Sequence, residues 1–175
     1  MARAFSNKEI LQVAYPILIS LIMEQLIGMT DTAFLGRVGE VELGASAIGG
    51  IFYLAIFMIG FGFSIGSQIL IARRNGEHYQ EIGDIFYQGL YFMIFLAAVT
   101  FTATKVLAPH ILPNIVSSVH VSEAALSYLH FRVIGFFFSF IAMMFRAFFV
   151  GTTQTKTLTL NSMVMVGSNI VFNYI

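Results

Sequence analysis

Two carboxylates, Glu24 and Asp31, lie inside the first long apolar stretch of the sequence. Seven residues separate them, which is almost two turns of an α-helix, so both would point to one face about 10 Å apart along the axis. On one face they could share an aqueous cavity. Ionisable groups within hydrocarbon are costly and are usually functional, and a carboxyl group that is neutral in one state and charged in another could couple ion binding to transport.

Each carboxylate also has a structural interpretation, and both alternatives stay open. Either carboxylate could pair with Arg132 or Arg146 to support packing, or Asp31 could lie in the outer headgroup region as an ordinary charge at a helix end. Arg146 is predicted near the cytoplasmic end of its apolar run, where its long aliphatic stem could anchor the helix at the interface.

Asn169 and Asn173 add polar groups to the last apolar run. They are four residues apart and therefore lie on one helical face, where their amide oxygens could ligate sodium beside Asp31. Hydrogen bonding between helices explains the same spacing equally well. Apart from such a sodium ion we expect no metal and no cofactor, because cysteine is absent and the histidines lack the spacing of a metal site.

The elements that must position these residues are transmembrane helices. The chain is 58% hydrophobic and 10% charged with a mean hydropathy of +0.84, whereas soluble domains contain about 25% charged residues. The sequence therefore predicts an all-α, polytopic helix bundle in the lipid bilayer, and its net charge of zero argues against nucleic-acid binding. About five helices are expected, at residues 10–36, 43–72, 85–108, 124–150 and 158–175.

Prolines and small residues predict details of these helices. Pro16 should bend the first helix, and Pro109 and Pro113 should end the third. Small residues at spacings of four should let neighbouring backbones approach the second helix closely. They occur at Ala45 and Gly49, and again at Gly62 and Gly66.

Basic residues predict the orientation, because short loops rich in Lys and Arg stay in the cytoplasm. Only Arg37 and Lys105 fall on the loops of the opposite side, so the N-terminus is predicted to be cytoplasmic. The expected location is the plasma membrane, which in bacteria is the inner membrane. The final run is still apolar at Ile175, which predicts a piece of a longer chain. The basic residues that share the N-terminal side are Arg3, Lys8, Arg73, Arg74 and Lys156.

Several segments resemble the MATE (multidrug and toxic compound extrusion) transporters. The segment AYP at 14–16 and the segment MTDTAFLGRVG at 29–39 resemble that family's opening helix. The segment RAFFVGTTQT at 146–155 is similar to the end of its fourth helix. Asn169 and Asn173 fall where its fifth helix carries an asparagine followed four positions later by an acid.

This resemblance implies a transporter and not an enzyme. Such a protein would be a proton- or sodium-coupled antiporter of twelve helices in two lobes, exporting amphipathic and mostly cationic organic compounds. The chain would be a partial N-terminal six-helix lobe, with the C-terminal lobe missing. Asp31 and Asn169 would match the family's ion ligands and Pro16 its bending proline. Asn173 departs from the usual acid, and Glu24 matches no assigned role.

The sequence leaves three other functions as alternatives. A flippase for lipid-linked oligosaccharides would need a more cationic cavity than Arg132 and Arg146 provide. A scaffold that does not transport would use its polar residues only to hold helices together. The pattern Gly62-Phe63-Ser64-Ile65-Gly66 matches the nucleophile elbow of serine hydrolases, but that motif requires a strand, a turn and a helix.

Overall fold

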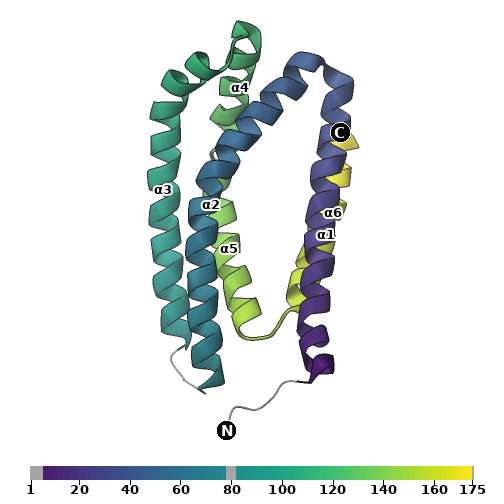
Figure 1. The fold of residues 1–175 in the computed structure, drawn as a ribbon, viewed down its shortest axis with the longest axis vertical. Coiled ribbons are helices and arrows are strands. Elements are labelled where there is room, and N and C mark those ends of the chain that lie inside the picture. Colours follow the sequence, from purple (N-terminus) through teal and green to yellow (C-terminus); the bar gives the residue numbers. More distant parts are fainter. Residues whose placement is uncertain (1–5, 78–81, 175) are drawn as a thin grey trace.

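The computed structural model describes residues 6–77 and 82–174, the last two by backbone alone. Helices dominate this part of the chain and follow one long axis (Figure 1), which confirms the all-α prediction. The elements are α1 (Asn7–Val38), α2 (Glu40–Gly76), α3 (Ile82–Ile115), α4 (Val119–Arg132), α5 (Gly135–Gly151) and α6 (Lys156–Tyr174).

Three of these helices, α1, α2 and α3, are each long and apolar enough to cross a membrane. The pair α4 and α5 passes the same test only when taken together, with a bend of 53° between them. Where one continuous helix was predicted over 124–150, the chain therefore forms two helices that meet at residues 133–134. The fifth predicted run corresponds to α6. This helix does not meet the length and hydropathy test for a membrane span.

Prolines lie inside two of the long helices. The prediction that Pro109 and Pro113 end the third helix is wrong, because α3 continues through both to Ile115. Pro16 likewise lies inside α1, which is continuous from Asn7 to Val38. Membrane helices tolerate proline because neighbouring groups can satisfy the backbone carbonyls that it leaves without a donor.

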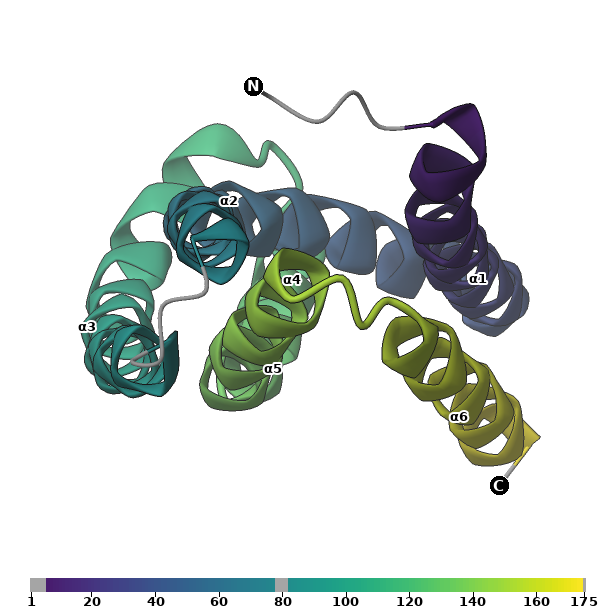
Figure 2. The same ribbon diagram turned by 90° about the horizontal axis from the view of Figure 1, so that it is seen from below.

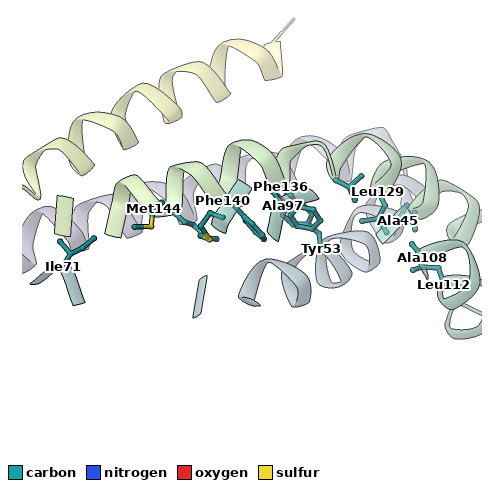
Figure 3. Close-up of a cluster of buried hydrophobic side chains, with 14 residues drawn as sticks. Ala45, Tyr53, Ile71, Ala97, Ala108, Leu112, Leu129, Phe136, Phe140 and Met144 are labelled. Carbon is teal, nitrogen blue, oxygen red and sulfur yellow. The ribbon is translucent and has the colours of Figure 1, made fainter. Parts of the chain in front are cut away.

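The helices form two groups. The first consists of α2, α3, α4 and α5, which pack on one another around the buried core. Within that core Tyr53 of α2 stacks on Phe136 of α5 with ring centroids 4.4 Å apart, and Phe140 and Met144 continue the row along α5 (Figure 3). The second group is α1 packed against α6, which stands apart when the molecule is viewed from below (Figure 2).

Close packing of α2 uses small residues, but only in part those predicted. Gly49 lies against Tyr128 of α4, where an added Cβ would come within 2.7 Å of the ring, in agreement with the prediction. Gly62 and Gly66 have open space around them, so the prediction for that pair is wrong. The position that faces the core is instead Gly60, where a Cβ would meet the Phe140 ring at 2.7 Å.

Candidate functional site

Asp31 and Asn169 are brought together across the two helices of the second group. Asn169 Nδ2 of α6 donates a hydrogen bond of 2.7 Å to Asp31 Oδ1 of α1. Both residues are half-buried. A carboxylate in this place can take up a proton, and it can bind a small hard cation together with the amide if the amide turns its oxygen toward the ion.

Asn173 lies one helical turn after Asn169 in α6. Its spacing places the two residues on the same face of the helix. Its side chain lies outside the described residues, so its participation in a cation site with Asp31 stays a prediction.

Pro16 also lies where α1 meets α6. Its carbonyl oxygen accepts hydrogen bonds from Ser20 Oγ, one turn later in α1, at 2.9 Å and from Thr159 Oγ1 of α6 at 3.1 Å. Ser20 is almost fully buried. The proline is therefore part of the contact between α1 and α6, on the same helix pair as Asp31 and Asn169.

Glu24 has a different partner from Asp31, although the two share a helix. Arg146 Nη1 of α5 donates to Glu24 Oε1 at 3.0 Å, and the two side chains are 27% and 37% exposed respectively. This contact joins α1 to α5 and so connects the two helix groups. Of the two arginines predicted as possible partners of a carboxylate, Arg146 is the one that pairs with Glu24. Arg146 thus points to a carboxylate inside the fold.

This ion pair lies on the wall of a cavity of about 600 Å³. Residues of α5 and α6 form most of its wall, and Glu24 and Phe57 contribute from α1 and α2. Asp31 is not among the lining residues, so this cavity is not the shared one expected for the two carboxylates. Phe138, Phe145 and Phe149 make much of the wall aromatic.

Arg132 contacts two tyrosines, which the sequence did not predict. It lies at the end of α4, beside the bend, and donates to the Tyr128 hydroxyl. Its guanidinium lies 4.8 Å from the centroid of the Tyr53 ring and 5.3 Å from that of Tyr128. The spacing of four residues between Tyr128 and Arg132 could have predicted their contact, since it places the two side chains on one helical face.

The remaining motifs do not build a second kind of site. Ser64 of the elbow-like pattern is buried inside α2, whereas a nucleophile elbow needs a sharp turn between a strand and a helix. Among the described residues no group of three or more His, Cys, Asp and Glu side chains could hold a metal ion.

Comparison with known proteins identifies relatives for nearly the whole chain. The probable multidrug resistance protein NorM of Pasteurella multocida is 25% identical over 173 residues, which are 96% of this chain and 36% of that protein. NorM of Bacillus subtilis is 24% identical over 169 residues, 96% of this chain and 37% of the relative. The chain therefore spans a little over a third of the length of these relatives.

A solved structure has the same fold. A MOP superfamily transporter from Pyrococcus furiosus, reported to have a binding pocket of reversed polarity, superposes with a TM-score of 0.89 at 18% identity. The superposition covers 95% of this chain and 37% of the archaeal one. At that identity the likeness establishes the arrangement of the helices alone.

The family model described as MatE matches residues 16–175, a range that includes every polar residue of the α1–α6 contact described above. Together with the apolar helices, this match makes the chain an integral membrane protein. The chain belongs to the MatE family of transporters.

Proposed function

We propose that the chain forms part of a cation-coupled antiporter that uses protons or sodium to export amphipathic, mostly cationic organic compounds. The hydrogen bond between Asp31 and Asn169 carries this proposal, because an ionisable group and an amide that could bind a cation meet there between two helices of a membrane protein. The names of the NorM relatives support organic compounds as the substrates. The relatives are almost three times as long as this chain. Transport is therefore proposed for a protein of that length and not for these residues alone.

Competition for Asp31 between the organic substrate and the proton or sodium ion would couple export of the one to import of the other. An ionised Asp31 accepts a strong hydrogen bond from Asn169 and attracts a cationic substrate. When Asp31 takes up a proton, its charge disappears and the attraction is lost. When it takes up sodium, Asn169 turns its amide so that the oxygen faces the ion. Each event changes the contact between α1 and α6, and the preferred packing of that pair shifts with it.

The positions of basic residues support an orientation with the N-terminus in the cytoplasm. The start of α1, the end of α2, the start of α3 and the α5–α6 connection lie at one end of the molecule (Figure 1). Lys8, Arg73, Arg74 and Lys156 belong to that end. Basic residues of short loops favour the cytoplasmic side. We propose the bacterial inner membrane as the location.

The experiment that tests the proposal is drug efflux by Asp31→Asn in the full-length protein. This variant keeps the size of the side chain and removes its ionisation, so coupled efflux should be lost while membrane insertion stays normal. Asp84→Asn is the matched control, because Asp84 is exposed in the first turn of α3, away from the α1–α6 contact. Wild-type drug resistance in cells that carry Asp31→Asn would refute the assignment.

A further inference from the structure

A second cavity, of about 130 Å³, lies between α3 and α4. Most of its wall is apolar and consists of Ala108, Pro109, Leu126, Leu129 and Val133. Its polar groups come from Thr104, Lys105 and His130. No carboxylate is among the lining residues in the described part of the chain, so the cavity has a net positive charge and suits an anion.

Lys105 is held in this cavity by the bend between α4 and α5. At the bend, the Ile134 amide donates to the Phe131 carbonyl and not to that of His130, one helical turn before it. The Lys105 ammonium donates to this His130 carbonyl at 3.0 Å, and the lysine is half-buried. An ammonium has three N–H groups. Within the described ranges this bond uses one of them, so two remain for an anion.

The cavity lies near the level where the hydrocarbon of a bilayer meets the lipid headgroups. With 34 residues, α3 is about 51 Å long, which is about 20 Å more than the hydrocarbon core. Its ends therefore extend beyond the core, and Lys105 lies about 15 Å before the end at Ile115. A lysine at this depth can reach the headgroup phosphates with its long aliphatic stem.

The adjoining surface of α3 suits a lipid chain. Ala98 and Thr102 precede Lys105 on one face of the helix, at spacings of four and three, and both are exposed. They line a shallow groove that continues over Val106 and Leu107 and has no charged residue among its described lining. A ligand with its phosphate in the cavity can lay an acyl chain along this groove. These contacts favour a phospholipid over free phosphate.

The charges of the cavity distinguish between phospholipids. The headgroup of phosphatidylethanolamine carries an ammonium, which would lie beside Lys105, where the described lining residues offer it no carboxylate. Phosphatidylglycerol has the same phosphate and a neutral glycerol headgroup. Like charges repel most strongly where water is partly excluded. The cavity should therefore prefer the anionic lipid.

We propose that the cavity between α3 and α4 binds the phosphate of an anionic phospholipid, with Lys105 and the His130 ring as its ligands. Lys105 then links the lipid to the His130 carbonyl at the α4–α5 bend. The bound lipid stabilises the packing of α3 on α4 beside that bend. The Asp31–Asn169 contact lies on other helices, so lipid binding and ion coupling are separate properties.

The test measures lipid binding to the full-length protein in detergent by native mass spectrometry. Phosphatidylglycerol and phosphatidylethanolamine with identical acyl chains are titrated separately. The wild type should bind phosphatidylglycerol about tenfold more tightly, a difference that one close pair of like charges can supply. Equal affinity for the two lipids would overturn the proposal.

Lys105→Met removes the ammonium and keeps the aliphatic stem, so it should abolish the preference for phosphatidylglycerol, whereas Lys105→Arg should retain it. Arg37→Met is the matched control, because Arg37 is an exposed base in the last turn of α1 and does not line the cavity. The control should bind both lipids as the wild type does. An unchanged preference in Lys105→Met, or an equal loss in Arg37→Met, would refute the assignment of Lys105 as the phosphate ligand.

His130→Leu gives a second test that leaves the bend intact, because it removes the imidazole and keeps the backbone carbonyl to which Lys105 donates. Its affinity for phosphatidylglycerol should fall about threefold, as expected for one modest hydrogen bond, and an unchanged affinity would count against the site. Millimolar inorganic phosphate should not displace the bound lipid. Displacement would show that the cavity binds free phosphate, and it would overturn the lipid assignment.

Discussion

Pro16 illustrates how single residues connect α1 to α6. Proline has no amide hydrogen, so one carbonyl in the preceding turn loses its usual donor. The Pro16 carbonyl also accepts from two hydroxyls, those of Ser20 in α1 and Thr159 in α6. The residue that weakens the backbone of α1 thus also holds this helix to its neighbour.

Thr159→Val tests this contact at the level of one hydrogen bond. Valine keeps the shape and removes the hydroxyl, so the Pro16 carbonyl loses its interhelical donor. We expect a loss of about 0.5–1.5 kcal/mol, seen as a lower Tm in detergent. Thr102→Val is the control, because the Thr102 hydroxyl bonds to Ala98 O within its own helix and is exposed. An equal decrease in both variants would show that the contact with Pro16 contributes nothing specific.

At the scale of helices, the phase of small residues decides how closely α2 and α5 pack. Gly60 meets the Phe140 ring, whereas Gly62 in the same helix has nothing within 4 Å of an added Cβ. The difference follows from geometry, because two residues further along a helix is about 200° around it. A spacing rule identifies a helix with small residues but not which of them faces the neighbour.

Gly60→Val and Gly62→Val form a matched pair. The two changes have the same cost in helix propensity, so their difference reports packing alone. Gly60→Val should lower stability by about 1–3 kcal/mol more than Gly62→Val, since it forces α2 away from Phe140 or the ring out of its rotamer. Thermal unfolding of the two variants in one detergent measures this. A larger loss of stability in Gly62→Val than in Gly60→Val would show that Gly62, and not Gly60, faces the neighbouring helix.

For the whole molecule, the important feature is the division into α2–α5 and the pair α1–α6. Glu24 and Arg146 form a side-chain hydrogen bond that crosses between these groups. Chain connections at Gly39 and at residues 152–155 join them elsewhere. The cavity lies along this boundary, so a ligand there contacts both groups at once.

The orientation of the molecule can be measured with introduced cysteines, because these 175 residues contain none. Gln154→Cys and Glu40→Cys place exposed thiols at opposite ends of the helices. In spheroplasts, a maleimide that cannot cross membranes should label Glu40→Cys at once and Gln154→Cys only after permeabilisation. The reverse pattern would place the N-terminus outside.

The sequence by itself determined that this is a helical membrane protein and which of its residues are unusual there. Hydropathy, the spacing of Glu24 and Asp31 in one apolar run and the presence of Asn169 in another are local properties, readable without knowing how helices pack. The resemblance to MATE transporters was also carried by local segments, and the family match confirms it.

Only the tertiary structure decided which polar groups meet. Asp31 and Asn169 are 138 residues apart in the chain, and Glu24 and Arg146 are 122 apart. Glu24 and Asp31 share a face of α1, yet Glu24 bonds to α5 and Asp31 to α6, although α6 also contacts α1 at Pro16, on the other side of Glu24. The bend between α4 and α5 was likewise absent from the hydropathy pattern, since the apolar run continues across it. Relative tilt and rotation of helices come from packing, which no single segment encodes.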